Sequence, residues 1–179
     1  MKGTTVWITG LPASGKSSVA GALAGALAVH GRQAVLLDGD ELRRGLNADL
    51  GFGKADRAEN VRRVGEVAKL FALAGVVAIV AAISPYRGGR DGVRSAHAAA
   101  GVGFLEVFMD TPARLCEERD PKGLYARARA GELPGFTGID DPYERPANPD
   151  LVLTPEMGDS AELARLISVL LDRAEAACV

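Results

Sequence analysis

Residues 10–17 read G-L-P-A-S-G-K-S and match the pattern G-x-x-x-x-G-K-[ST] at every position. In such a loop the glycines let backbone N–H groups converge on phosphate oxygens, and the following helix adds partial positive charge. Lys16 is expected to reach the β- and γ-phosphates, and the Ser17 hydroxyl to ligate Mg²⁺. The nucleotide-binding residues expected from this segment are Gly10, Leu11, Pro12, Ala13, Ser14, Gly15, Lys16, Ser17 and Ser18.

The phosphate loop predicts nucleotide binding but not a particular reaction. GTPases, motor ATPases and small-molecule kinases all use it. The sequence contains no N-K-x-D segment to read guanine, which argues against a GTPase.

Two carboxylates, Asp38 and Asp40, follow a second apolar run. Ligands of open α/β sheets bind outside the carboxyl ends of the strands, so both are expected near the nucleotide. One can serve the metal and the other can accept a hydroxyl proton. The third apolar run ends in Ile83-Ser84-Pro85 without an aspartate, which leaves Asp38 or Asp40 to supply the metal carboxylate. The alternative is a solvated D-G-D turn, and the neighbouring phosphate loop favours the functional interpretation.

Basic side chains cluster after these strands. Arg43 follows the acidic pair by one helical turn, and Arg57 and Asn60 are spaced to share one helical face. Arginine forks bind phosphate and sulfate in a bidentate manner, so Arg87 and Arg90 are further candidates. Solvated helix faces are the favoured interpretation for Arg62, Arg63 and Arg94.

Two phenylalanines lie in glycine-rich stretches that lack a clear period, Phe52 in Gly45–Lys54 and Phe136 in Gly131–Pro149. Loops of this kind often act as lids or binding loops. Planar rings on such loops can stack on both faces of a nucleobase. The alternative is that the rings anchor the loops by tucking into the core, and composition leaves both open. Trp7, inside the first apolar run, is expected in the core.

The elements that must position these groups alternate between apolar runs and helical patterns. This alternation predicts right-handed βαβ units, a parallel sheet of about five strands and a three-layer α/β/α domain. The predicted strands are Thr4–Thr9, Gln33–Asp38, Val76–Ile83, Phe104–Met109 and Asp150–Leu153. The predicted helices start near Lys16 and end at Gly31, start at Asp56 and end at Gly75, and span Arg90–Ala100, Thr111–Arg119, Lys122–Ala130 and Ala161–Ala176.

Composition bounds the class of protein. The 179 residues fit one domain over residues 1–179, and a net charge of −2 argues against a nucleic-acid binder held by broad electrostatics. Cys116 and Cys178 form neither a disulfide framework nor a zinc spacing, which suits a reducing cytosol. No signal peptide is evident, and the longest aliphatic run, Val76–Ile83, is too short to span a bilayer. A cytoplasmic protein without membrane partners is expected.

The combined motifs resemble the adenylyl-sulfate kinase (APS kinase) family from Val6 to about Leu153. The segments that carry the resemblance are GLPASGKSS, LDGDELRRGLNADLGF, DRAENVRR, ISPYR, CEERDPKGLYARARAGELPGFTGIDDPYE and PDLVL. The resemblance implies a P-loop kinase that moves the γ-phosphoryl of ATP to the 3′-hydroxyl of adenosine 5′-phosphosulfate (APS), giving PAPS and ADP in sulfate activation. It implies Mg²⁺ and commonly a homodimer. Any ATP sulfurylase that works with it is expected to be a separate chain.

The resemblance also assigns residues. The APS contacts it implies are Asp40, Arg43, Phe52, Arg57, Asn60, Ile83, Ser84, Lys122, Gly135 and Phe136, with the two phenylalanines on either side of the adenine. The ATP adenine is expected near Arg119 and residues 155–163. The catalytic set is expected to be Lys16, Asp38, Asp40 and Ser84, with Asp40 deprotonating the acceptor hydroxyl. Ser17 would hold Mg²⁺ directly, and Asp38 or Asp40 would do so through water.

Ser84 matches a serine described in some members as a phosphoserine intermediate. Direct transfer needs no enzyme nucleophile, so Ser84 is expected to position substrate.

The chain departs from the family pattern at Glu41, where asparagine is usual, and in Pro12-Ala13-Ser14 of the phosphate loop. Glu41 adds negative charge near an anionic substrate, and either Arg43 or Arg44 could pair with it. We expect its side chain to point away from the ligand. The rival functions are a kinase for another small acceptor and a catalytically inactive nucleotide-binding module.

Overall fold

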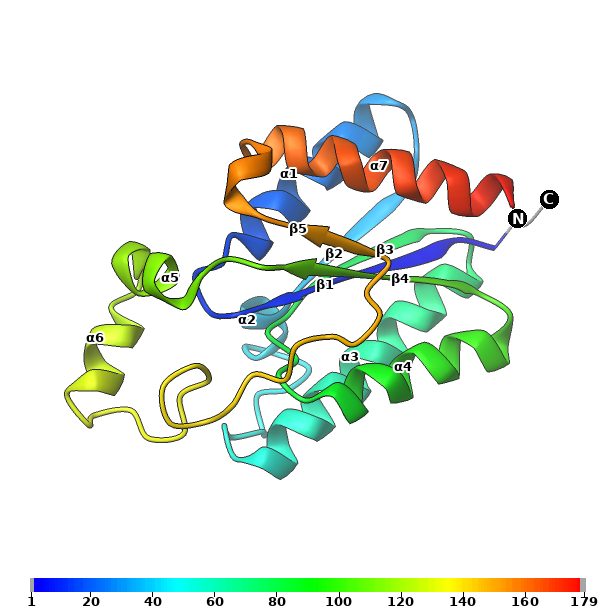
Figure 1. Cartoon of the computed structure of the whole chain (residues 1–179). Coiled ribbons are helices and arrows are strands. Elements are labelled where there is room, and N and C mark those ends of the chain that lie inside the picture. The colour runs from blue at the N-terminus through cyan, green and yellow to red at the C-terminus, as the bar shows by residue number, and fades with distance from the viewer. Residues whose placement is uncertain (1, 178–179) are drawn as a thin grey trace.

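The computed structural model describes residues 2–177 and contains a five-stranded parallel sheet between two layers of helices (Figure 1). The strand order is β2-β3-β1-β4-β5, and every neighbouring pair is parallel. The strands are β1 (Thr4–Gly10), β2 (Ala34–Asp38), β3 (Val77–Ala81), β4 (Gly103–Met109) and β5 (Leu151–Leu153). The predicted fold class is confirmed.

Helices cover both faces of this sheet. Helices α1 (Lys16–Val29) and α7 (Ser160–Ala176) pack together on one face, and α3 (Lys54–Leu73) and α4 (Arg87–Ala100) pack together on the other (Figure 1). The remaining helical segments are short: α2 (Gly39–Leu42), α5 (Ala113–Arg119), α6 (Leu124–Arg129) and a 3₁₀ turn, η1 (Pro155–Met157).

Two apolar cores form because β1 is buried on both faces. Val6 and Ile8 point toward the α1/α7 layer, and Trp7 points toward the α3/α4 layer, as the two-residue period of a strand requires. Trp7 is fully buried, as expected. Cys116 is buried and free, and Cys178 lies outside the described residues.

Several element boundaries differ from the sequence expectations. The run Val76–Ile83 forms a shorter strand than predicted, since β3 spans Val77–Ala81 and a φ of 41° at Ser84 turns the chain soon after it. Helix α4 begins at Arg87 rather than Arg90, and α3 begins at Lys54 rather than Asp56. Helix α2 was not predicted, since its four residues are too few for an apolar period.

The packing of α3 on α4 positions the residues that α3 contributes to the site, and it depends on a glycine. A Cβ added at Gly65 would lie 2.5 Å from Cγ2 of Val93 on α4. The absence of a side chain therefore sets how closely the two helices approach.

We predict opposite stability effects for two helical glycines. Gly65→Ala gains about 1 kcal/mol of helix propensity, but overpacking against Val93 costs about 1–3 kcal/mol. Gly21→Ala in α1, where an added Cβ meets nothing within 4 Å, keeps the gain and stabilises by about 0.5–1 kcal/mol. Urea unfolding measures both. A Gly65→Ala variant as stable as Gly21→Ala would contradict this account of the interface.

Candidate functional site

A cavity of about 880 Å³ opens at the carboxyl ends of β1, β2 and β3. Its walls come from the phosphate loop, α2, the start of α3, the β3–α4 loop and the segment that joins α5 to α6. The expected site residues that line it are Pro12, Ala13, Ser14, Gly15, Lys16, Ser17, Ser18, Asp38, Asp40, Arg43, Phe52, Arg57, Asn60, Ile83, Ser84, Arg119 and Lys122. Most of the expected donor and acceptor residues are thus brought together.

The phosphate loop takes its curled shape from two left-handed residues. Gly15 has φ 100°, which glycine adopts without strain, and Ala13 has φ 59°, which is uncommon for a residue with a side chain. Contacts from behind fix the loop. The Tyr125 hydroxyl donates to the Pro12 carbonyl at 3.1 Å, and the Thr111 hydroxyl donates to the Ser14 carbonyl at 3.0 Å.

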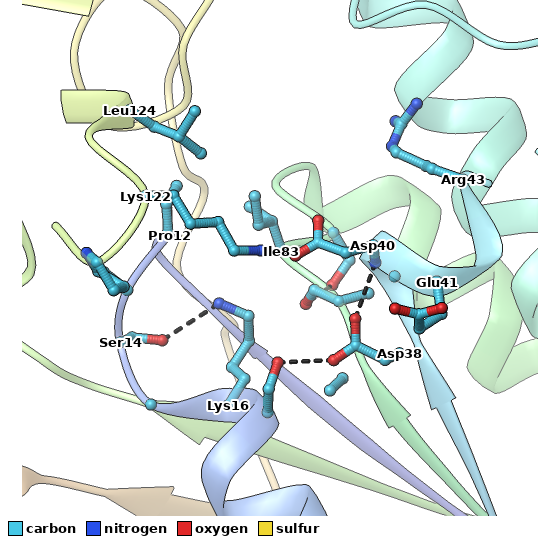
Figure 2. Close-up of a pocket in the computed structure, with 18 of the residues that line it drawn as sticks. Pro12, Ser14, Lys16, Asp38, Asp40, Glu41, Arg43, Ile83, Lys122 and Leu124 are labelled. Atoms are coloured by element: carbon cyan, nitrogen blue, oxygen red, sulfur yellow. Dashed lines mark hydrogen bonds and ion pairs between the residues drawn. The ribbon is translucent and has the colours of Figure 1, made fainter. Parts of the chain in front are cut away.

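Lys16 folds back over this loop (Figure 2). Its ammonium donates to the carbonyls of Gly10 at 3.0 Å and Leu11 at 2.6 Å, and to the Ser14 hydroxyl at 3.3 Å. Gly10 and Leu11 do not line the cavity themselves, and they contribute to the site through the carbonyls that bind Lys16. Burial lowers the pKa of the Lys16 ammonium to about 8, because the charged form is poorly solvated there.

Ser17 and Asp38 form the oxygen-rich corner of the site. The Ser17 hydroxyl donates to Asp38 Oδ2 at 2.6 Å, and Asp38 Oδ1 accepts from the backbone N–H of Asp40 at 2.9 Å (Figure 2). The second bond caps the start of α2. Mg²⁺ prefers hard oxygen ligands and completes its shell with waters and substrate phosphates, so this hydroxyl and carboxylate fit it.

Asp40 points into the cavity and forms an ion pair with Lys122, which comes from the α5–α6 segment (Figure 2). Both side chains are more than half exposed, so the pair is screened by water and is worth little in stability. A substrate can therefore replace either partner at low cost.

The acceptor side of the cavity is built on α3. Arg57 is 7% exposed and donates to the carbonyls of Phe52 and Gly135, both at 2.8 Å. The Arg43 guanidinium lies over the Phe52 ring, 4.4 Å from its centre. The Phe52 ring itself is 60% exposed. This side thus presents an accessible aromatic face beside two arginines.

Phe136 and Gly135 differ from the expectation because they do not line this cavity. Phe136 is only 7% exposed and packs edge-on against Tyr125, with ring centres 5.0 Å apart. The Asp140 carboxylate holds the backbone N–H groups of Gly135 and Phe136 at 2.7 and 2.6 Å. The structure therefore agrees with the alternative interpretation of this ring as a loop anchor, while Arg57 holds the loops of both phenylalanines through the carbonyls of Phe52 and Gly135.

Ser84 lines the cavity, but its hydroxyl faces the core. Its Oγ accepts from Trp7 Nε1 at 3.0 Å and donates to Thr9 Oγ1 at 2.8 Å. The side chain is buried, and a φ of 41° turns the chain sharply. A hydroxyl committed to these partners is poorly placed to act as a nucleophile.

Glu41 pairs with Arg44 through Oε1 at 2.8 Å, and both side chains are largely exposed. One of the two expected partners is thus the observed one. Arg90 does not have the position expected of a residue that binds phosphate or sulfate. It is buried against Glu106 on β4 and does not line the cavity, and Arg87 and Arg94 do not line it either.

Asn47 holds a residue of the site in place, and the sequence patterns did not single it out. Asn47 is fully buried and donates through Nδ2 to Asn60 Oδ1 at 3.0 Å. Its own Oδ1 has no hydrogen-bond partner among residues 2–177. Asn47 lies in an irregular loop, inside a segment that carries the family resemblance, and neither feature predicted its burial.

Comparison with known proteins agrees with this geometry. Residues 2–154 match the adenylylsulphate kinase family. The bifunctional enzyme CysN/CysC of Mycobacterium tuberculosis is 56% identical over 169 residues, which cover 94% of this chain and 28% of that protein. An adenylyl-sulfate kinase of Yersinia pestis is 54% identical over 173 residues, which cover 97% of this chain and 80% of the relative.

A solved structure matches the whole architecture. The Mycobacterium tuberculosis APS kinase CysC in complex with AMPPNP and APS superimposes with a TM-score of 0.93 at 57% identity, covering 96% of this chain and 98% of that one. The chain belongs to the adenylylsulphate kinase family. It spans about a quarter to three fifths of the length of several relatives, 28% of the mycobacterial bifunctional enzyme and 62% of an Arabidopsis thaliana adenylyl-sulfate kinase.

Within residues 2–177 of this adenylylsulphate kinase family member, none of the helices combines the length and the apolar character needed to cross a bilayer.

The lowered pKa of Lys16 predicts a pH-dependent affinity for ATP. Below about pH 8 the free protein carries the ammonium, and above it the amine is neutral. Phosphate binding favours the charged form and raises its pKa, so binding above pH 8 takes up a proton and weakens by up to about tenfold per pH unit.

Titration calorimetry with ATP between about pH 7 and pH 9.5 measures this dependence. Lys16→Arg is the matched control, because its guanidinium stays charged throughout that range. A wild-type affinity that stays constant across the range would contradict the role assigned to Lys16.

Proposed function

We propose that this chain transfers the γ-phosphoryl group of ATP to the 3′-hydroxyl of APS, giving ADP and PAPS. The observation that carries the proposal is the shared cavity. It joins the phosphate loop, the Asp38–Asp40 pair and the acceptor side of Arg43, Phe52 and Arg57. In-line transfer needs two substrates held end to end, and this cavity offers a phosphate site and a base-stacking site on either side of a carboxylate.

The chain's own groups have separable roles. Lys16 exchanges its loop carbonyls for phosphate oxygens and neutralises charge on the transferring group. Asp40 orients the acceptor hydroxyl and accepts its proton, once substrate has displaced Lys122 from the carboxylate. Lys122, released from Asp40, is then free to meet substrate anions.

Mg²⁺ fits this site as the ion that neutralises phosphate charge and orients the ATP oxygens. Ser17 would hold it directly, and Asp38 or Asp40 would do so through water. The Ser17–Asp38 contact at 2.6 Å supports this assignment, because it places a hydroxyl and a carboxylate side by side.

Glu41 departs from the family pattern and lines the cavity, so its charge bears on which acceptor is bound. The Arg44 partner offsets its charge, so the anionic acceptor meets a neutral pair rather than a bare carboxylate. An inactive nucleotide-binding module is disfavoured by the presence of Lys16, Ser17, Asp38 and Asp40 in one cavity.

The proposal also covers the compartment, the pathway and the oligomeric state of the protein. We propose that the chain acts in the cytoplasm, in sulfate activation, as a homodimer. The dimer and the place in sulfate activation rest on the family resemblance, and the cytoplasmic setting rests on the cysteine usage. Sedimentation velocity of the purified chain tests the dimer directly.

The central prediction is APS-dependent turnover. Purified protein with ATP, Mg²⁺ and APS is expected to form PAPS and ADP in equal amounts, identified by mass spectrometry. Lys16→Ala should lower turnover by about 10³-fold or more, because it removes the cation that faces the transferring phosphoryl group. The protein should still fold, since Lys16 contributes no apolar packing. Turnover with another acceptor but not with APS would contradict the proposal.

The two phenylalanines are predicted to behave differently. Phe52→Ala removes an exposed stacking face and should weaken APS binding by about 1–3 kcal/mol, with ATP binding nearly unchanged. Phe136→Ala empties a buried site and should destabilise the fold by about 3–5 kcal/mol. Phe136→Leu keeps most of the volume and serves as its control. Loss of APS affinity in a fully stable Phe136→Leu variant would show that this ring also contacts the base.

A further inference from the structure

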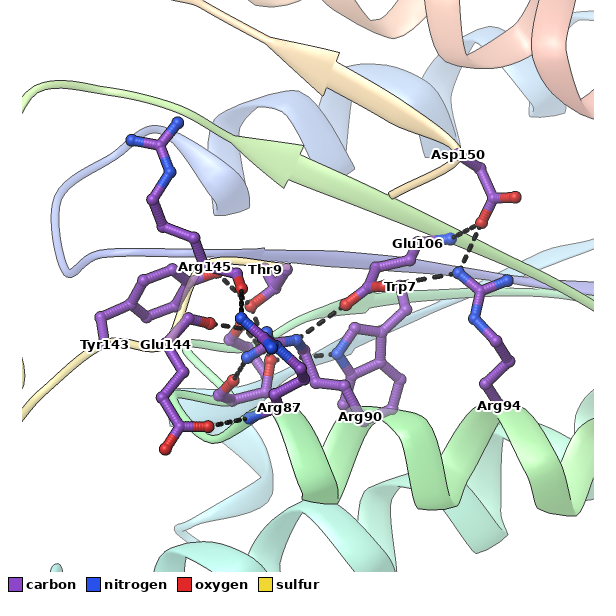
Figure 3. A network of polar contacts seen from close by, with 12 residues as sticks. Trp7, Thr9, Arg87, Arg90, Arg94, Glu106, Tyr143, Glu144, Arg145 and Asp150 are labelled. Atoms are coloured by element: carbon purple, nitrogen blue, oxygen red, sulfur yellow. Dashed lines mark hydrogen bonds and ion pairs between the residues drawn. The ribbon is translucent and has the colours of Figure 1, made fainter. Parts of the chain in front are cut away.

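Arg90 on α4 is a buried charge that the proposed mechanism does not use. Its side chain is 1% exposed, and Nε donates to Glu106 Oε1 on β4 at 2.7 Å (Figure 3). Buried ion pairs are seldom more stabilising than apolar side chains of similar volume. Stability alone therefore gives no reason for an arginine at this position. The partners of its other two nitrogens, Nη1 and Nη2, suggest a different role.

The remaining donors of Arg90 join two segments that are far apart in sequence. Nη1 donates to the carbonyl of Ser84, and Nη2 donates to the carbonyl of Glu144, each at 2.6 Å. The guanidinium is planar and its donors have fixed directions, so these two carbonyls and Glu106 are held in one geometry. Lysine offers a single ammonium and could not span all three.

Ser84 is the acceptor-side residue that this geometry fixes. Its φ of 41° is unusual for serine and persists only if surrounding contacts hold it. Its hydroxyl is held by Trp7 and Thr9, and its carbonyl is held by Arg90. Because both the hydroxyl and the carbonyl of Ser84 are hydrogen-bonded within the protein, the turn at Ile83 and Ser84 has one conformation where it lines the cavity.

The second carbonyl belongs to residues 137–145, here called the strap. The backbone N–H of Glu144 donates to the Pro85 carbonyl at 2.8 Å, and the Tyr143 hydroxyl lies 2.9 Å from that of Thr9. Further along the strap, Asp141 accepts from the Tyr86 hydroxyl at 3.0 Å and lies 3.8 Å from Arg57 Nε. The strap therefore connects Arg90 to an arginine of the acceptor side.

We propose that Arg90 is a positioning residue for the acceptor half of the cavity. By holding the carbonyls of Ser84 and Glu144 together, it sets the turn at Ile83–Ser84 and, through the strap, the placement of Arg57. This inference rests on the proposed function, since it assigns Arg90 to APS rather than to ATP. The hydrogen bonds to the phosphate-loop carbonyls of Ser14 and Pro12 come from Thr111 and Tyr125, neither of which contacts Arg90, so ATP binding should change much less than APS binding.

Arg94 provides a matched control one helical turn away. Its Nη2 lies 3.4 Å from the same Glu106 and 2.7 Å from Asp150, and it makes no hydrogen bond to Ser84 or Glu144 (Figure 3). Both arginines thus contact the carboxylate of Glu106, but only Arg90 binds the turn at Ile83–Ser84.

The test compares steady-state kinetics of Arg90→Lys, Arg94→Lys and the wild type, with melting temperatures recorded for each. Arg90→Lys is expected to raise the KM for APS at least tenfold and to leave the KM for ATP within twofold. Arg94→Lys is expected to leave both within twofold. A folded Arg90→Lys variant with an unchanged KM for APS, or with equal rises in both KM values, would overturn the proposal.

A second variant covers the case in which Arg90→Lys does not fold. The double substitution Arg90→Gln with Glu106→Gln leaves no unpaired charge in the core, so it removes the main cause of misfolding. It is expected to show the same selective rise in the KM for APS, and a wild-type KM would overturn the proposal. Failure of the wild type to phosphorylate APS would instead contradict the proposed function itself, before any variant is compared.

Discussion

Parallel pairing of β1 with both β3 and β4 is the constraint on which the rest of this site depends. Gly10, the last residue of β1, is in register with Met109 of β4, and Asp38 of β2 is in register with Ala81 of β3. All strands therefore end at one edge, where the phosphate loop lies beside the acidic pair. A sheet with β1 at its border would leave the loop without an acceptor wall.

The charged groups of the cavity make contacts within the protein. Lys16 lies on loop carbonyls, Asp40 pairs with Lys122, and Arg43 covers the ring of Phe52. Each of these contacts is one that a phosphate, a hydroxyl or a purine can replace. Substrate binding then exchanges contacts rather than bringing bare charges together, which limits the desolvation cost of binding two anions.

Sequence spacing placed residues that lie next to strand ends better than residues whose position depends on the path of residues 131–149. Lys16 lies in the loop and helix start that follow β1, and Asp38 is the last residue of β2. The local sequence pattern and the sheet topology are therefore enough to place both residues. Phe136 and Arg90 depend on how residues 131–149 fold back across the molecule. No periodic signal in the sequence specifies that path. Phe136 was therefore expected in the cavity but is buried beside Tyr125. Arg90 was expected to bind anions but donates to backbone carbonyls.

In the proposed reaction one cavity brings both substrates together for direct transfer, while the hydroxyl of Ser84 stays bound to Trp7 and Thr9. The most direct test is the stereochemical course at phosphorus, using ATP whose γ-phosphoryl group is made chiral with oxygen isotopes. A single in-line transfer predicts inversion of configuration in the product. Retention would require two successive transfers through an enzyme nucleophile and would contradict the account.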